Sequence, residues 1–401
     1  MLHSHTSKIS CPGCGSIDIK IFYEIRQVPV HSVLLLNSRS EAENYPRGDI
    51  RLGFCQGCGF IFNTAFDPGV HEYSSRYEAT QGYSPTFNAF HKNLAQTLID
   101  RFDLHGKRII EIGCGQGEFL SLLCELGGNT GIGFDPAYVP ERSPVGQNER
   151  VSFIQDFYSE KYVSTGGDFV CCKMTLEHIP QVADFVGMVR RSVEQNLQAT
   201  IFFQVPNARY VFGEIAFWDI YYEHCSYFSL GSLARLFARS GFEVIDLWKD
   251  YDDQYLMIAA RPVSERPQNL FALPDDMSEL AQEIDHFSAQ YPHRLAAWRQ
   301  KIAGFTGAGK RVVLWGGGSK AVAFLTTLGI TTGEIAYAID INPHKTGSFI
   351  AGTGQEIQSP QFLLAYRPDV VIVMNPVYCT EVRQALQQMG LYPEVMAVNS
   401  H

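Results

Sequence analysis

The stretch Ile110-Glu111-Ile112-Gly113-Cys114-Gly115-Gln116-Gly117-Glu118-Phe119-Leu120 decides the fold. It joins a short apolar strand to the start of an amphipathic helix through three glycines at alternate positions. Glycine tolerates backbone conformations that other residues avoid, and it lets the backbone approach a ligand closely. Such a turn is typical of the carboxyl edge of a parallel α/β sheet. The sequence therefore predicts a doubly wound α/β sheet with a ligand-binding turn after Ile112.

A second predicted strand, Thr130–Asp135, ends in a carboxylate that can accept hydrogen bonds from both cis hydroxyls of a ribose. The glycine spacing G-x-G-x-G differs from the G-x-G-x-x-G of dinucleotide binders. With an acid at the strand end, it resembles motif I of class I S-adenosylmethionine methyltransferases. The resemblance implies a cofactor site made by Glu111, Gly113, Gly115, Gly117 and Asp135. In that family the glycines lie against the methionine moiety and the second-strand acid holds the ribose.

Asp156 and Phe157 follow the third predicted strand, Val151–Ile154. Asp156 is placed to accept a hydrogen bond from the adenine amino group, and Phe157 to cover a ring face. A helix N-cap or a solvated loop acid is the alternative for Asp156. Both residues are therefore candidates for the adenine end of the cofactor site.

Four cysteines form two copies of the motif C-x-x-C-G, at Cys11 and Cys14 and at Cys55 and Cys58. The two-residue gap lets both thiolates face one metal ion, and the glycine permits the turn that follows. Four sulfurs suit structural, tetrahedral zinc with no open position. Disulfides and redox activity are the alternatives, and a reducing compartment disfavours disulfides. The long interval between the pairs predicts an inserted hairpin or loop across residues 15–54.

The composition is that of an ordinary globular enzyme, with 45% hydrophobic and 18% charged residues in 401. A net charge of −10 without a long basic run argues against nucleic acid as a partner. No apolar run is long enough to cross a bilayer, and the N-terminus lacks the hydrophobic region of a signal peptide. We therefore expect a cytoplasmic protein without a membrane partner, either monomeric or homodimeric.

The chain divides into a zinc-binding module (residues 1–70), a methyltransferase domain (71–260, with 71–106 as a helical lead-in), a linker with helices (261–306) and a second Rossmann-like α/β domain (307–401). The linker holds Pro262, Pro267 and Pro274, and the helical stretch after it is expected to be interrupted at Pro292. The strands expected in the central domain are Arg108–Ile112, Thr130–Asp135, Val151–Ile154, Phe169–Lys173, Thr200–Val205 and Gln254–Ala260. The last domain is expected to have strands beginning at Arg311 and over Ile335–Asp340, Asp369–Met374 and Val395–Val398.

Two histidines follow predicted strands, His178 and His224. The stretch around His224, Asp219-Ile220-Tyr221-Tyr222-Glu223-His224, is dense in polar and aromatic groups between apolar segments. Such density is costly to bury unless it lines a site. Histidine also has a reference pKa of about 6.5, which suits a base that removes a proton beside a carbonyl.

With these motifs the chain resembles the sugar C-methyltransferases of deoxysugar pathways, which methylate C3 of nucleotide-linked 4-keto sugars. The phrases that carry the resemblance are Phe217-Trp218-Asp219-Ile220-Tyr221-Tyr222-Glu223-His224, Ser319-Lys320 and Asp340-Ile341-Asn342-Pro343-His344-Lys345. The resemblance implies three parts: a four-cysteine zinc module, a class I methyltransferase domain and a C-terminal Rossmann-like domain that holds the nucleotide sugar. The cofactors it implies are S-adenosylmethionine and zinc.

The resemblance also implies roles for single residues. His224 would be the base that forms the enolate, while Tyr221, Glu223 and His178 would orient the substrate or assist proton transfer. Tyr77 or Tyr83 would supply a further phenol. Ser319, Lys320 and Asp340 would bind the substrate. Because adjacent residues of a strand point to opposite sides, Glu223 and His224 can both face a ligand only from a loop or turn.

Other readings of the chain stay open. Tyr251-Asp252-Asp253-Gln254-Tyr255 and Met374-Asn375-Pro376-Val377-Tyr378 depart from the sugar enzymes' pattern, so an O- or N-methyltransferase acting on a non-sugar metabolite is one alternative. Gly316-x-Gly318-x-x-Ala321, with Asp340 after the next strand, meets the dinucleotide fingerprint, which makes an NAD-dependent oxidoreductase a second. A non-catalytic protein with a degenerate cofactor fold is the third.

Overall fold

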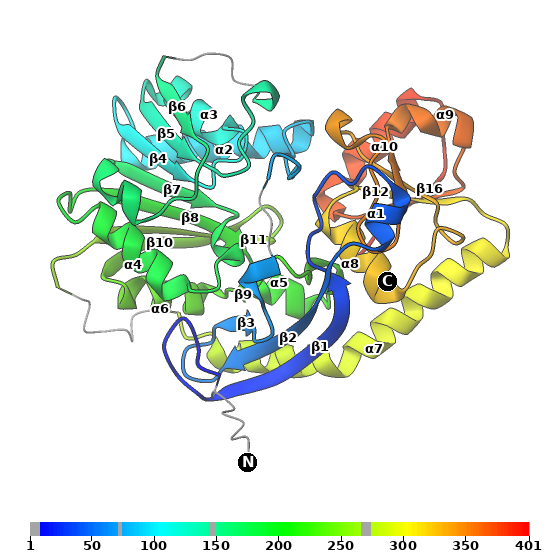
Figure 1. Ribbon diagram of the computed structural model, residues 1–401, viewed down its shortest axis with the longest axis horizontal. Coiled ribbons are helices and arrows are strands. Elements are labelled where there is room, and N and C mark those ends of the chain that lie inside the picture. Colours follow the sequence, from blue (N-terminus) through cyan, green and yellow to red (C-terminus); the bar gives the residue numbers. More distant parts are fainter. Residues whose placement is uncertain (1–8, 71–73, 144–148, 266–273, 401) are drawn as a thin grey trace.

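The structure is a computed structural model that describes residues 9–70, 74–143, 149–265 and 274–400. Three sheets of four, seven and five strands follow one another along the chain (Figure 1). None of the helices within the described ranges has the length and apolar character needed to span a bilayer.

The first sheet has the order β1-β2-β3-β9 and is antiparallel throughout. Its strands are β1 (Ile19–Pro29), β2 (Arg47–Cys55), β3 (Ile61–Asn63) and β9 (Ser226–Tyr227), and α1 (Arg39–Glu43) lies between β1 and β2. The β1–β2 hairpin fills the long interval between the two cysteine motifs, as the sequence predicted. Strand β9 comes from a distant part of the chain and starts two residues after His224.

The central sheet has the order β10-β11-β8-β7-β4-β5-β6. Its strands are β4 (Arg108–Ile112), β5 (Thr130–Phe134), β6 (Val151–Ile154), β7 (Phe169–Lys173), β8 (Thr200–Pro206), β10 (Phe242–Asp250) and β11 (Tyr255–Pro262). The five strands from β8 to β6 are parallel, and β10 and β11 are antiparallel. The doubly wound sheet is confirmed. The sequence located six of these strands but not β10.

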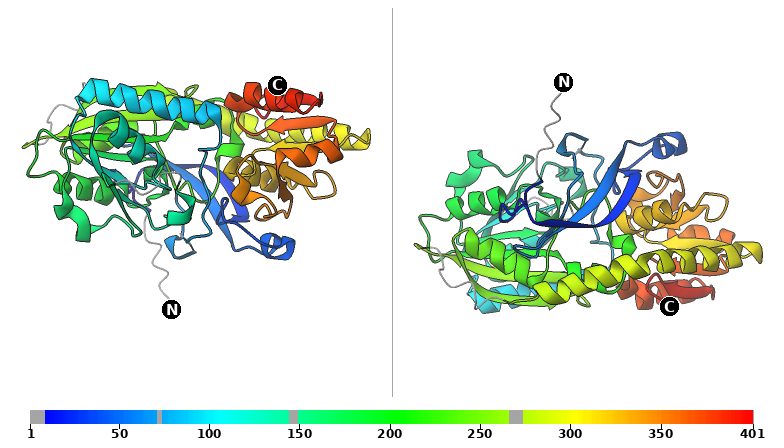
Figure 2. Two further views of the ribbon diagram at one scale, coloured as in Figure 1. Left: turned by 90° about the horizontal axis from the view of Figure 1, so that it is seen from above. Right: turned by 90° about the horizontal axis from the view of Figure 1, so that it is seen from below.

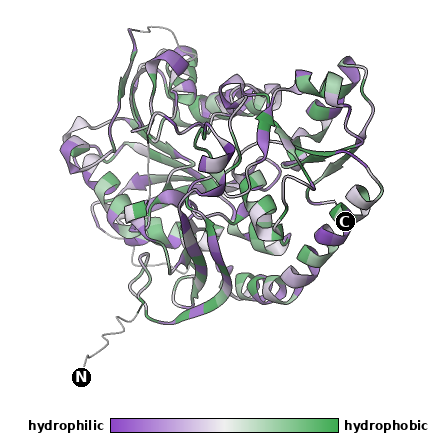
Figure 3. Cartoon of the chain, turned by 45° about the vertical axis from the view of Figure 1, so that its right-hand side comes forward, coloured by the Kyte–Doolittle hydropathy of each residue, from purple (hydrophilic) through white to green (hydrophobic). Residues whose placement is uncertain are grey.

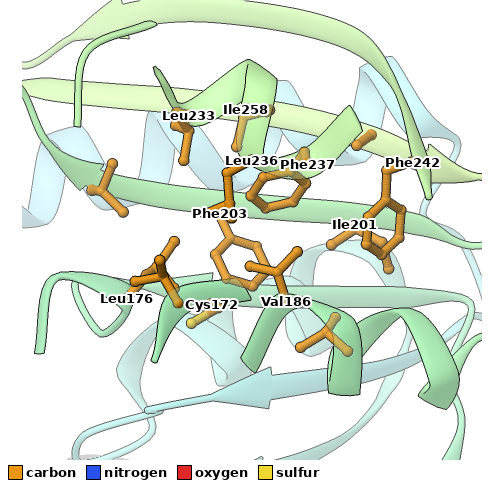
Figure 4. Close-up of a cluster of buried hydrophobic side chains, with 14 of the residues drawn as sticks. Cys172, Leu176, Val186, Ile201, Phe203, Leu233, Leu236, Phe237, Phe242 and Ile258 are labelled. Atoms are coloured by element: carbon orange, nitrogen blue, oxygen red, sulfur yellow. The ribbon is translucent and has the colours of Figure 1, made fainter. Parts of the chain in front are cut away.

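Helices cover both faces of the central sheet because both faces of its parallel strands are apolar. The helices of this region are α2 (Pro85–Phe102), α3 (Glu118–Gly127), α4 (Val182–Ser192), α5 (Ala208–Gly213) and α6 (Leu230–Arg239). Helices α2 and α3 pack on the face that carries Ile109 and Phe202, whereas α4 and α6 pack on the opposite face. There Phe203 lies between Val186 and Phe237 (Figure 4).

The third sheet is parallel, with the order β14-β13-β12-β15-β16. Its strands are β12 (Val312–Trp315), β13 (Tyr337–Ile339), β14 (Glu356–Gln358), β15 (Val370–Val373) and β16 (Glu394–Ala397). Its helices are α8 (Ser319–Leu328), α9 (Leu363–Tyr366) and α10 (Cys379–Gln388). The second Rossmann-like unit is therefore present, with the three-residue β14 as a strand that the sequence did not show.

The long helix α7 (Met277–Gly307) joins the central and C-terminal regions. It runs along one side of the molecule, against α5 and β1 and then against α8 (Figure 2, right), and it mixes hydrophilic and hydrophobic stretches (Figure 3). The expected interruption at Pro292 is wrong, because the helix continues through it. Buried side chains on both sides of the proline, including Ile284, Phe287 and Trp298, hold the helix in place. Of the linker prolines, Pro262 ends β11 and Pro267 lies outside the described residues.

Candidate functional site

The carboxyl edges of the central and C-terminal sheets contribute residues to one cavity. In the central sheet β4 lies between β5 and β7, and in the C-terminal sheet β12 lies between β13 and β15. Ligands of open α/β sheets bind at the carboxyl ends of the strands at such points. Residues that follow β7, β12, β13 and β15 all line a cavity of about 300 Å³. The two α/β units therefore present their ligand-binding edges to the same space.

Two of the three glycines in the turn after β4 leave no room for a side chain. Gly113 has φ +71°, and a Cβ there would lie 2.0 Å from Thr175 Oγ1. Gly117 has φ +88°, and its Cβ would lie 2.3 Å from the ring of Phe153. Around Gly115, with φ +55°, no atom lies within 4 Å of the Cβ position. Neighbouring side chains thus pack against Gly113 and Gly117, while the space beside Gly115 is free. A cofactor could lie there against the backbone of the turn.

Asp135 follows β5 and lies beside this turn. Its Oδ2 accepts a hydrogen bond from Gly115 N at 2.9 Å and its Oδ1 one from Ala137 N at 2.8 Å. A carboxylate oxygen has two lone pairs, so each oxygen can still accept one bond from a ribose hydroxyl. Burial raises the pKa of Asp135 to about 6, although both backbone donors act against this. The residues present therefore fit S-adenosylmethionine.

Replacement of Asp135 with alanine is expected to weaken the binding of S-adenosylhomocysteine by about 100-fold. Two hydrogen bonds to a charged acceptor contribute about 1.5 kcal/mol each, and a tenfold change in affinity corresponds to about 1.4 kcal/mol. Isothermal titration at pH 8 measures the change. Because protonation of Asp135 removes the charge, the affinity of the wild-type protein should also fall below pH 6. The exposed Asp184 on α4 supplies the matched control Asp184→Asn, and unchanged affinity in Asp135→Ala would refute the assignment.

Glu111 lies within β4 and is only 2% exposed. Its Oε2 has no hydrogen-bond partner among the described residues. Burial raises its pKa to about 8, although the charge of Lys173 acts against this. Lys173 is buried as well, with its Nζ 3.0 Å from His91 Nε2 and 3.6 Å from the centre of the Phe119 ring. The place of Glu111 in the cofactor site remains a prediction.

Asp156 and Phe157 lie at the surface beyond β6. The Tyr162 hydroxyl donates a hydrogen bond to Asp156 Oδ2 at 2.6 Å, and Lys161 Nζ lies 3.1 Å from the same oxygen. These two hydrogen bonds lower the pKa of Asp156. The Phe157 side chain is 57% exposed. Adenine binding by this pair remains a prediction.

Tyr221, His178 and His224 line the cavity together. The Tyr221 hydroxyl lies 2.8 Å from His224 Nε2, and the two imidazole rings are 5.0 Å apart and nearly perpendicular. Burial lowers the pKa of His224 well below its usual value, and the nearby His178 and Lys320 lower it further. His224 is therefore neutral at pH 7, which a proton acceptor must be. The structure thus brings together three side chains that the sequence singled out separately.

Glu223 points away from this group. It is 1% exposed and does not line the cavity. Its Oε1 lies 2.9 Å from His31 Nδ1, and its Oε2 accepts hydrogen bonds from the backbone N–H, at 2.8 Å, and the hydroxyl of Ser32. Burial alone would raise the pKa of Glu223, but the bonds from His31 and Ser32 outweigh this and lower it. Glu223 is thus placed as a buried anion behind the cavity wall.

Tyr77 and Tyr83, between which the sequence could not choose, both line the cavity. Burial raises the pKa of Tyr77 well above its usual value, whereas Tyr83 is 40% exposed. The ring of Tyr83 lies 6.2 Å from that of His344 in the C-terminal region. Tyr77 is therefore the better enclosed of the two phenols.

The C-terminal wall of the cavity is formed by the turn before α8 and by the loop after β13. Ser319 Oγ lies 2.8 Å from the Ser32 hydroxyl oxygen, and Lys320 Nζ pairs with Asp219. Asp340 Oδ2 accepts hydrogen bonds from Gly317 N at 2.9 Å and from Lys345 Nζ at 3.2 Å. The three predicted residues, Ser319, Lys320 and Asp340, all line the cavity.

Sequence reasoning did not single out three further polar residues of the wall, Glu177, Lys345 and Gln254. Lys345 belongs to the quoted stretch that begins at Asp340, and Glu177 directly precedes His178, so these neighbours were the available signal. Gln254 Nε2 donates a hydrogen bond to Asn375 Oδ1 at 3.0 Å. That contact joins the central and C-terminal regions, and no motif indicates it.

The cysteine motifs also converge in space. Cys11 and Cys58 have their Sγ atoms 3.7 Å apart, and Cys14 and Cys55 have theirs 3.6 Å apart. Four sulfurs about 2.3 Å from one zinc ion would be about 3.7 Å from each other, whereas a disulfide bond is about 2.05 Å. The two motifs form equal turns, with Gly15 N donating to Cys11 O and Gly59 N to Cys55 O, each at 2.8 Å. All four cysteines are free thiols with the spacing of a possible metal site.

Comparison with known proteins agrees with this geometry. Residues 87–247 match the family model described as methyltransferase domain, and residues 275–391 match that described as C-methyltransferase C-terminal domain. The chain is 26% identical over 388 residues to the C-methyltransferase NovU of Streptomyces niveus, covering 93% of this chain and 90% of NovU.

Two solved structures are similar to part of the chain. A 1,6-didemethyltoxoflavin-N1-methyltransferase of Burkholderia thailandensis is 16% identical, with a TM-score of 0.36, over 46% of this chain and 83% of its own. The magnesium protoporphyrin IX methyltransferase of Synechocystis PCC 6803 is 14% identical, with a TM-score of 0.35, over 44% of this chain and 84% of its own. With the two family models and NovU, the chain is an S-adenosylmethionine-dependent methyltransferase whose residues 275–391 match the C-terminal domain of C-methyltransferases.

Proposed function

We propose that this enzyme methylates the carbon beside a carbonyl group of a nucleotide-linked keto sugar, with His224 as the base. The observation that carries the proposal is the neutral, buried His224, which lies in one cavity between the cofactor-binding edge of the central sheet and the C-terminal edge. The family resemblance supplies the sugar, and the C-methyltransferase relative supports carbon as the methylated atom.

The first step is removal of a proton from the acceptor carbon. In this role His224 donates its Nε2–H to the Tyr221 hydroxyl, which leaves the lone pair of Nδ1 for the substrate. The C–H bond breaks, the proton goes to Nδ1, and the electron pair leaves one negative charge on the carbonyl oxygen. His178 and Tyr77 lie in the same wall and orient the carbonyl group.

The cofactor supplies an electrophilic methyl group on a sulfonium sulfur. The glycine turn at Gly115 and the Asp135 carboxylate would hold this cofactor, whose methyl group would bond to the acceptor's electron pair while sulfur keeps the electrons of the broken bond. The protein's main task is to hold both reactants in line within a closed cavity.

The C-terminal region is suited to the nucleotide. The N-terminus of α8 offers positive charge to a diphosphate, and Lys320 and Lys345 would add to it by exchanging their ion pairs with Asp219 and Asp340 for the phosphates. Asp340 follows β13 as Asp135 follows β5. A carboxylate at this position can accept a hydrogen bond from a ribose hydroxyl. We therefore assign one unit of the chain to the methyl donor and the other to the nucleotide of the acceptor.

The test is a titration with S-adenosylhomocysteine, followed by incubation of that complex with nucleotide-linked keto sugars in D2O. Exchange of deuterium into the carbon beside the carbonyl is expected, because the base acts before the methyl group moves. A sugar that is methylated on oxygen, or one that binds without exchange, would contradict carbon chemistry. Binding of the cofactor product without binding of any sugar would place the acceptor in another class.

We also propose that zinc fills the four-cysteine site and has a structural role. The sulfur spacing fits tetrahedral zinc, and four protein ligands leave no position for a substrate. The site contacts the α4–α6 side of the central domain through Phe60 and Arg235, whose Nε donates to Cys58 O at 3.0 Å. Zinc there would fix the first sheet against the domain that carries His224.

A further inference from the structure

Glu177 is a buried carboxyl group in the wall of the cavity that the proposed reaction leaves unused. It lies in the short 3-10 helix Leu176–His178 after β7 and is 0% exposed. Neither of its carboxyl oxygens has a hydrogen-bond partner among the described residues. One of these oxygens lies within 4.8 Å of a ring nitrogen of His178 and of one of His224. A buried polar group without a hydrogen-bond partner costs about 1–3 kcal/mol of stability. A ligand that forms a hydrogen bond with Glu177 would offset this cost.

Among the described residues, the groups that interact with Glu177 offer it no positive charge at neutral pH. Burial lowers the pKa of His178 and of His224, which leaves both rings neutral. Lys320, the lysine that affects His224, is paired with Asp219. Burial also raises the pKa values of the phenols and thiols that interact with Glu177 or its backbone, so these too stay neutral: Tyr77, Tyr221, Tyr255, Cys172 and Cys225.

An ionised carboxylate in this setting would be unpaired and desolvated, which is the costly state. Burial accordingly raises the pKa of Glu177 to about 8. At pH 7 the group is therefore mainly a neutral carboxylic acid, which has one O–H to donate. No described residue is hydrogen-bonded to either carboxyl oxygen, and the side chain lines the cavity.

We propose that Glu177 is a catalytic residue that donates a hydrogen bond from its neutral carboxyl group to the acceptor's carbonyl oxygen as negative charge forms there. The inference rests on the proposed function. While His224 takes the proton from carbon, Glu177 keeps its own proton and stabilises the charge through the hydrogen bond. A donor fixed in a water-poor cavity acts more strongly on a developing charge than it would in water. Because Glu177 lies close to both histidines, the donor Glu177 and the base His224 can act on the carbonyl group and its neighbouring carbon at the same time.

The test compares Glu177→Gln, which keeps the size and a neutral donor, with Glu177→Leu, which keeps the bulk but removes the donor. At pH 7 the glutamine variant is expected to stay within about tenfold of wild-type kcat, and the leucine variant to lose more than about 100-fold. Wild-type kcat should decline above pH 8 as Glu177 ionises, and this alkaline limb should be absent from the glutamine variant. Affinity for S-adenosylhomocysteine should be unchanged in both variants.

A second measurement, of thermal stability, does not require the methyl-accepting substrate. The raised pKa means that the unfolded chain ionises Glu177 from pH 4.5 upward while the folded protein keeps it protonated until pH 8. The folded wild-type protein therefore loses stability across this range. Glutamine does not ionise and so causes no pH-dependent loss of stability. The Tm of Glu177→Gln minus the Tm of wild type should therefore increase from pH 5 to pH 8.

Four results would overturn the proposal: a glutamine variant as slow as the leucine variant, a leucine variant near wild type, a Tm difference that is independent of pH, or a second zinc or manganese ion per chain that Glu177→Gln loses. If no keto sugar is methylated, the proposed function fails. The Tm comparison still decides the protonation of Glu177, and so separates the two failures.

Discussion

Replacement of His224 with glutamine is expected to reduce turnover by about 10³-fold or more, within the range by which a positioned base accelerates proton transfer. The amide cannot accept a proton at neutral pH, and it retains a donor for the Tyr221 hydroxyl that the imidazole contacts at 2.8 Å. Exchange of solvent deuterium into the acceptor without methyl donor should be lost to the same degree. Both are measured by mass spectrometry of the recovered substrate and product.

The variant must keep its cofactor site for this result to have meaning. His224 is 5% exposed and lines the cavity, whereas the glycines of the turn after β4 do not. Affinity for S-adenosylhomocysteine should therefore stay within threefold of wild type. The exposed His105, outside the cavity, gives the matched control His105→Gln with normal turnover. If His224→Gln turns over at a near-normal rate, the base is another group and the enolate mechanism loses its central residue.

The sequence located the parts of the fold whose signals are local. The glycine turn at Gly113, the carboxylate at Asp135 and the cysteine pairs depend on spacing within a few residues, and the structure places all of them as predicted. Helix α2 likewise begins after Ser84, whose hydroxyl accepts from Phe87 N. In each case backbone geometry or metal-ligand spacing constrains the residue type directly.

The features that the sequence missed depend on distant contacts. Pro292 removes one helical hydrogen bond, and a proline within a helix costs about 3 kcal/mol. Phe287 on one side and Trp298 on the other pack into different hydrophobic clusters, which is information that no local window contains. Burial of one such aromatic side chain contributes about 1.5–3 kcal/mol. The packing on both sides therefore outweighs the loss and keeps α7 continuous.

In the functional site too, the features that the sequence did not reveal depend on contacts between distant residues. Glu223 and His224 lie in the turn before β9, where adjacency in sequence does not fix their directions, and the partner of Glu223 could not be foreseen either. His31 lies 192 positions away and reaches the carboxylate only because β1 leads into the wall of the cavity. Ser32 then connects Glu223 to Ser319 of the C-terminal region. All three parts of the chain thus meet behind His224, and only the assembled fold shows it.

Loss of the metal from the four-cysteine site is expected to have the largest effect on stability. Binding of structural zinc contributes about 10–16 kcal/mol in isolated zinc fingers, where it is folding free energy. With an unfolding entropy of about 2.1 cal/mol/K per residue, a third of that value would lower the Tm of this 401-residue chain by about 4–6 °C. Cys55→Ser should therefore melt at least about 4 °C below wild type, and metal analysis should fall from one zinc ion per chain to near zero.

The loss should also reach the active site, because the first sheet supports the His224 loop directly. Strand β3 pairs with β9, and Asn63 N donates to Cys225 O at 2.9 Å next to His224. Tyr222 Oη accepts from Asp67 N at 2.8 Å on the other side of the same loop. Turnover by Cys55→Ser, measured below its Tm, should therefore fall more than its affinity for S-adenosylhomocysteine. The half-buried Cys379 lies outside the cluster, so Cys379→Ser is the control that keeps zinc and Tm. A wild-type protein with well under one zinc ion per chain would show that the four thiols hold no metal.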